Sequence, residues 1–168
     1  VTASFAGLHF TRELMKRMEI KGIETAFVTM HTGLGCFREI DVEDLTKHKM
    51  DSDLINVDTE AVQKVNKAKA EGRRVCAIGT SVQRVLETAT LTGGMLKEFD
   101  GWTSKFIFPE HNFEVANCMI ANFYAPYSTM LMLTTAFGGY DNVMNAYKVA
   151  LEEGYRFGLY GDAMLIID

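Results

Sequence analysis

The sequence has few cysteines, and their spacing does not match a structural site. Cys36, Cys76 and Cys118 are the three cysteines in 168 residues, and no Cys-x-x-Cys pair occurs. This pattern argues against a disulfide framework and against a zinc knuckle. The four histidines also lack the spacing of metal ligands, so we expect no metal site. Reduced, mostly buried thiols in a cytoplasmic protein are the simplest interpretation.

The chain also has no excess of positive charge and no long apolar run. Its formal net charge is −5, which gives no overall electrostatic footprint for nucleic acid. An RNA contact would depend on a local patch such as the basic residues within 67–74. A cluster of this kind is more often a solvated helix end. Residues 115–140 carry no charge, but their apolar runs are shorter than the roughly 20 residues of a membrane-spanning helix. We expect a buried strand and a buried helix there, and no membrane contact.

What the sequence does contain is a regular alternation of helix and strand patterns. Capping residues and helical spacing predict helices at Thr11–Lys21, Asp58–Glu71 and Asp141–Glu153. They also predict a helix that begins at Thr80 or Ser81 and a helix at Met130. Short apolar runs predict strands at Ile23–Met30, Val75–Gly79, near Phe106–Phe108, within Phe113–Phe123 and at Ala163–Ile167. This order predicts an α/β fold with a mainly parallel sheet, in a single domain over residues 1–168.

Three polar loops follow predicted strands, at the edge where parallel sheets bind their ligands. They cover residues 31–35, 79–81 and 122–127. His31 is a candidate for proton transfer, although a lone histidine is more often structural. The segment 79–81 opens a helix, so it is either a simple cap or a site for an anion. The convergence of the three loops predicts a polar crevice.

Motifs that would identify the chemistry by themselves are missing. The chain has no dinucleotide fingerprint, no phosphate-binding loop and no nucleophile elbow. Arg84 and Glu87 lie three residues apart, which favours a local ion pair on one helix. The residues alone therefore predict an α/β domain with a polar crevice and leave its ligand open.

Six motifs run in order from Ala6 to the C-terminus. They are Ala6–Thr11, His31-x-Gly33-x-Gly35-x-Phe37-Arg38, His48-Lys49-Met50, Gly79-Thr80 with Arg84 and Leu86-Glu87, Asn122-Phe123-x-x-Pro126-x-Ser128-Thr129, and Tyr160–Ile166. Together they resemble the S-adenosylmethionine:tRNA ribosyltransferase-isomerases, enzymes of queuosine biosynthesis.

The resemblance implies an incomplete α/β barrel that carries an inserted antiparallel β-barrel domain. We expect this chain to be the C-terminal part of that barrel in a longer two-domain protein, with the inserted domain absent from it. The implied reaction transfers and isomerises the ribosyl part of S-adenosylmethionine onto 7-aminomethyl-7-deazaguanine in tRNA, which gives epoxyqueuosine. The implied partners are tRNA and S-adenosylmethionine as a substrate, with no prosthetic group. We also expect self-association through apolar surface that the fragment exposes.

The resemblance and the crevice together give the candidate site. His31 and His9 are the proton-transfer candidates. The substrate-binding candidates are Gly33, Gly35, Arg38, Thr80, Arg84, Asn122, Phe123, Tyr124, Tyr127, Ser128 and Asp162. Tyr124 and Tyr127 stand where the family usually has His and Lys, and we expect them to supply stacking surface. A non-catalytic relative that binds a nucleoside, RNA or a protein is therefore the alternative function.

Overall fold

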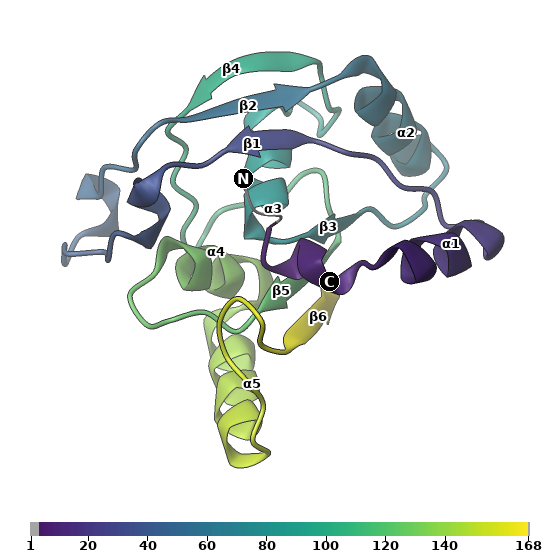
Figure 1. Ribbon diagram of the computed structural model, residues 1–168. Helices are drawn as coiled ribbons and strands as arrows, with labels where there is room; N and C mark the ends of the chain where they lie inside the picture. Colours follow the sequence, from purple (N-terminus) through teal and green to yellow (C-terminus); the bar gives the residue numbers. More distant parts are fainter. Residues whose placement is uncertain (1–3, 168) are drawn as a thin grey trace.

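The computed structural model describes residues 4–167, which form a mixed α/β fold with two small sheets (Figure 1). The first sheet has the order β1-β2-β4, with strands Thr29–His31, Asp53–Val57 and Phe99–Thr103. The second sheet has the order β3-β5-β6, with strands Cys76–Ile78, Cys118–Asn122 and Ala163–Ile167.

Five α-helices connect and cover these sheets within the described residues. They are α1 (Arg12–Ile20), α2 (Thr59–Ala70), α3 (Thr80–Thr88), α4 (Thr129–Gly138) and α5 (Tyr140–Glu152). Short 3₁₀ turns occur at Ala6–His9, Leu34–Phe37 and Leu45–Lys47. In Figure 1, α3 lies between the two sheets, and α5 points away from both. This central position lets α3 contact both layers.

Capping side chains explain where three of the helices begin. Thr11, Asp58 and Ser128 each accept a hydrogen bond from the backbone N–H three residues further on. α1 and α2 both end just before a glycine with positive φ, a conformation that disfavours side chains with a Cβ. The predicted helices at Thr11–Lys21, Asp58–Glu71 and Asp141–Glu153 are confirmed, with a shift of one residue at each end.

The prediction of a mainly parallel sheet is wrong for the described strands. β3 and β5 pair in parallel, whereas β1–β2, β2–β4 and β5–β6 pair antiparallel. β2 and β4 were not predicted, because Asp53, Asn56, Asp100 and Gly101 interrupt their apolar pattern. Their five-residue pairing with each other overrides these local preferences.

Two other predicted strands are shorter or absent. The first covers Thr29–His31 rather than Ile23–Met30, and the carbonyl of Thr25 instead accepts a hydrogen bond from Lys64 of α2 at 2.9 Å. Residues 106–108 form no strand. Their phenylalanine rings pack on each other with centroids 5.3 Å apart. The strand expected within 113–123 is limited to β5.

Two buried clusters form the core. The larger contains Ile55, Val85 and Met119, and so joins both sheets to α3. The smaller lies under α5, where Phe123 packs against Val143 and Tyr147. Several large apolar side chains lie outside these clusters and are 64% to 88% exposed, namely Phe27, Leu34, Phe37, Trp102 and Leu151. Within residues 4–167, no helix is both long enough and apolar enough to cross a membrane.

Candidate functional site

A cavity of about 830 Å³ lies between the end of β1, the N-terminus of α3 and the first turn of α4. Its volume is typical of sites that bind small molecules. Apolar side chains from several elements line it, including Phe5, Met30 and Met130. His31 and Tyr124 add polar groups to its lining. The cavity can therefore hold a ligand that has both apolar and hydrogen-bonding parts.

The N-terminus of α3 opens at this cavity. Gly79 precedes the helix with φ +102°, and it offers no side chain to cap the first N–H groups. A Cβ at this position would lie 3.3 Å from Ser4 Oγ, so both the backbone and the space favour glycine. Thr80 and Ser81 follow and line the cavity. The free N–H groups of the first turn can therefore bind an electron-rich ligand atom.

Tyr124 contributes a hydroxyl rather than an aromatic face. The side chain is 3% exposed, and its hydroxyl lies 3.5 Å from that of Thr80. Burial is the main cause that raises the pKa of Tyr124 above its usual value. The phenol therefore stays protonated at neutral pH and can donate a hydrogen bond into the cavity. Its backbone N–H donates to the Tyr147 hydroxyl at 2.8 Å, which fixes the segment against α5.

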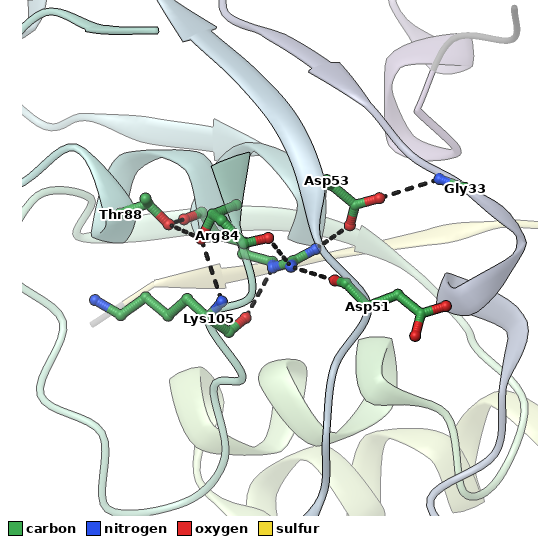
Figure 2. A network of polar contacts seen from close by, with 7 residues as sticks. Gly33, Asp51, Asp53, Arg84, Thr88 and Lys105 are labelled. Carbon is green, nitrogen blue, oxygen red and sulfur yellow. Dashed lines mark hydrogen bonds and ion pairs between the residues drawn. The ribbon is translucent and has the colours of Figure 1, made fainter. Parts of the chain in front are cut away.

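Arg84 fastens α3 to the first sheet (Figure 2). Its Nη1 donates to Asp53 Oδ2 at 2.5 Å, and both side chains are 5% exposed. Its Nε donates to the carbonyl of Lys105 at 2.8 Å, and its Nη2 donates to the carbonyls of Thr103 at 3.0 Å and Asp51 at 3.4 Å. Most of its N–H groups thus serve the protein itself, although Arg84 also lines the cavity.

Asp53 connects this arginine to the loop that follows β1. Its second oxygen, Oδ1, accepts a hydrogen bond from the backbone N–H of Gly33 at 3.0 Å, as Figure 2 shows. Cys36 lies further along the same loop and lines the cavity. Burial, followed by the negative charge of Asp53, raises the pKa of the Cys36 thiol, and Arg84 opposes this effect. The loop thus lies close to both members of the ion pair.

The local ion pair expected between Arg84 and Glu87 is wrong, because each side chain pairs elsewhere. Glu87 is 4% exposed, and its Oε2 lies 3.0 Å from His111 Nε2. Its Oε1 accepts hydrogen bonds from the backbone N–H groups of Glu114 and Val115. Glu87 therefore anchors the long segment between β4 and β5 to α3.

Of the predicted site residues, His31, Gly33, Thr80, Arg84 and Tyr124 all line the cavity. A second polar group lies at the end of β5, where His9 Nε2 is 3.1 Å from Asn122 Oδ1. The Asn122 amide donates to the carbonyl of Gly158 at 2.9 Å, and Asp162 accepts from the N–H of Arg156 at 2.7 Å. His9, Asn122 and Asp162 do not line the cavity. The structure thus divides the predicted site into two groups.

The remaining predicted residues occupy the edges of this region. Arg38 and Tyr127 line a shallower depression of about 660 Å³ next to the 39–41 segment. Arg38 also pairs with Asp51 at 3.3 Å, and a side chain at Gly35 would overlap that same aspartate. Ser128 caps α4, and Phe123 belongs to the smaller core cluster.

Sequence reasoning missed Asp53 and Cys36. Asp53 lies 31 residues before Arg84, in a strand that was not predicted, so no local pattern linked the two. Cys36 lies next to the predicted residues, but an isolated cysteine carries no signal of its own. The motif His31-x-Gly33-x-Gly35 was the signal that could have drawn attention to this loop.

Comparison with known families identifies the chain. A family model described as a queuosine biosynthesis protein matches residues 1–166. The chain belongs to this family. It is 68% identical over 168 residues to the S-adenosylmethionine:tRNA ribosyltransferase-isomerase of Phocaeicola vulgatus, and 53% identical over 167 residues to that of Cytophaga hutchinsonii.

The match covers the whole of this chain but part of its relatives. The chain spans about half the length of the curated relatives, 48% for both species. A crystal structure of S-adenosylmethionine tRNA ribosyltransferase from Thermotoga maritima is also similar, with 38% identity and a TM-score of 0.79. That similarity covers 96% of this chain and 51% of the other. The fold described above is thus shared with part of a solved member of the family.

Proposed function

We propose that this chain is part of a tRNA-modifying enzyme that transfers and isomerises the ribosyl part of S-adenosylmethionine. The acceptor in this proposal is 7-aminomethyl-7-deazaguanine in tRNA, and the product is epoxyqueuosine in tRNA. The family match over residues 1–166 carries the proposal. A cavity that combines apolar walls with hydrogen-bond donors supports it, because the donor substrate has both kinds of surface.

The reaction needs a base for a carbon-bound proton next to the sulfonium and a donor for the departing adenine. We assign proton transfer to His31, which lines the cavity at the end of β1. Thr80, Tyr124 and the first N–H groups of α3 are the proposed donors to the ligand. His9 is held by Asn122, and we propose that this pair acts at the neighbouring edge of the site.

The other predicted residues have supporting roles in this proposal. Arg38 and Tyr127 would contact tRNA at the depression beside the cavity, because both lie at its exposed rim. Phe123, Ser128 and Asp162 would hold the surrounding backbone, and Gly35 would allow the close approach of Asp51. The protein would act in the cytoplasm, as one domain of a longer protein. Self-association through the exposed apolar side chains is a further part of the proposal.

Tyr124 and Tyr127 favour one alternative, in which a non-catalytic relative binds a nucleoside, RNA or a protein. A buried phenol cannot take up a proton as an imidazole does, and Tyr127 lacks the charge of a lysine. In that case the whole protein would show no turnover. Replacing both tyrosines, by His at 124 and Lys at 127, would be required before turnover appeared.

The test uses the full-length gene product, S-adenosylmethionine and tRNA that carries 7-aminomethyl-7-deazaguanine. Release of adenine and formation of epoxyqueuosine are measured together. His31→Ala should lower kcat by about 100-fold or more and change the affinity for S-adenosylmethionine little, as the loss of an acid or base does. His48→Ala is the control, since His48 packs on Phe106 and does not line the cavity. Equal losses in both variants would reject the role of His31.

A further inference from the structure

The loop after β1 is held over the cavity by a buried charge. Residues 34–37 form a 3₁₀ turn, and its N–H groups at Cys36 and Arg38 bond to carbonyls within the loop. The Gly33 N–H instead donates to an acceptor outside the loop, Asp53 of β2, at 3.0 Å. Asp53 is itself fixed by Arg84 of α3. One carboxylate thus connects the loop, the first sheet and the helix whose N-terminus opens at the cavity.

We infer that Asp53 is a positioning residue of this site: its carboxylate, held by Arg84, fixes the Gly33 backbone and so sets the loop from His31 to Phe37 against the cavity. This inference rests on the proposed function for its catalytic meaning. The geometry that carries it stands independently, because Asp53 and Arg84 are each 5% exposed at their side chains and bond each other. An ion pair so well shielded from water keeps a fixed geometry and is screened little by salt.

Cys36 provides a reporter of this arrangement within the chain. The thiolate, not the thiol, reacts with iodoacetamide, so the rate of alkylation follows the local charge. Asp53 raises the pKa of Cys36 and Arg84 lowers it. Asp53→Asn should therefore increase the alkylation rate of Cys36 by about threefold or more, because it removes the negative charge and also releases the Gly33 backbone. Peptide-resolved mass spectrometry separates Cys36 from the other two cysteines.

A second buried carboxylate shows whether the effect is specific to Asp53. Glu87→Gln is the matched control, because it neutralises another buried carboxylate of the same region, whose contacts are with His111 and the 114–115 backbone. Its alkylation rate should stay that of the unchanged protein. Equal acceleration in Asp53→Asn and Glu87→Gln would overturn the inference.

The bond to Gly33 can be removed without changing any charge. Gly33 has φ −84°, close to that of proline, and a Cβ there would meet nothing within 4 Å. Gly33→Pro deletes the N–H that donates to Asp53, whereas Gly33→Ala keeps it. Hydrogen exchange of a peptide covering residues 34–38 should become about tenfold faster in the proline variant and stay unchanged in the alanine variant. Equal exchange in the two variants would overturn the inference. This test also decides the matter if Asp53→Asn fails to fold, because it leaves Asp53 unchanged.

The catalytic consequence is measured with the full-length enzyme. Asp53→Asn should lower kcat by about tenfold or more while KM for S-adenosylmethionine changes less than threefold, because a displaced loop misaligns His31. Glu87→Gln should leave kcat within about twofold. If the unchanged enzyme has no turnover, the proposed function fails, and the alkylation and exchange results still decide whether Asp53 positions the loop. A drop in kcat of the same size in both variants would reject the role.

Discussion

Replacing Arg84 by methionine should destabilise the fold far more than the loss of a surface arginine. The change removes a guanidinium that bonds Asp53, Lys105 and Thr103 and leaves the Asp53 carboxylate 4% exposed, with the Gly33 N–H as its remaining donor. Breaking a buried ion pair on one side typically costs about 3–5 kcal/mol, because the other charge stays buried. For a domain of this size, that corresponds to a fall in Tm of roughly 6–20 °C.

The same reasoning predicts partial recovery when the second charge is removed. In the double variant Asp53→Asn with Arg84→Met, no buried charge is left without a partner. It should therefore unfold at a higher urea concentration than Arg84→Met alone, by about 1–3 kcal/mol of coupling. Urea unfolding followed by circular dichroism measures all three variants, and the slope against urea checks that the denatured state is comparable.

Arg17→Met serves as the control for this series. Arg17 pairs with Glu13 at 2.6 Å on the surface of α1, where both side chains are more than 70% exposed. Such pairs contribute less than about 0.5 kcal/mol. The reasoning is refuted if Arg84→Met costs less than about 1 kcal/mol, or if the double variant loses the full sum of the two single losses.

Three other perturbations probe separate parts of the structure. Burial raises the pKa of Tyr147 to about 12, so the stability that its protonated phenol contributes is complete below a pH of about 10 and is lost as the pH rises to about 12. Tyr147→Phe should therefore flatten the plot of unfolding free energy against pH in that window. Ser128→Ala should lower the unfolding free energy by about 1 kcal/mol through loss of the α4 cap, whereas the exposed Ser104→Ala should change it by less than about 0.5 kcal/mol, both measured in urea. Gly79→Ala should lower Tm measurably, because φ +102° strains any residue with a Cβ.

The helices could be predicted because their signals are local. A cap such as Ser128 and a stop such as Gly72 act within a few residues, so the sequence contains them in full. The second sheet was predicted in part for the same reason, since β3 and β6 are short apolar runs. The family resemblance rested on motifs in order, and the comparisons confirmed it.

The direction and partners of the strands could not be predicted, because they depend on contacts between distant residues. β2 pairs with β4, 50 positions away at Asp53 and Thr103, and neither strand has a clean alternating pattern. The partner of Arg84 was missed for the same reason: the nearby Glu87 satisfied the local rule, and the correct partner lay on another element. The convergence of His31, Thr80 and Tyr124 was foreseen because each follows or borders a predicted strand.

The position of α3 between the two sheets has a consequence for how this protein varies among species. Along roughly 10 Å of one helix, Thr80 faces the cavity, Arg84 binds the first sheet and Glu87 holds the segment before β5. Arg84 and Glu87 each have a charged or titratable partner on a different element, so a change on one side of a pair leaves the other side without its partner. Positions 53 and 84 should therefore change together or remain unchanged across an alignment, and positions 87 and 111 should behave likewise. Natural drift in this region would then proceed by paired replacements rather than by single ones.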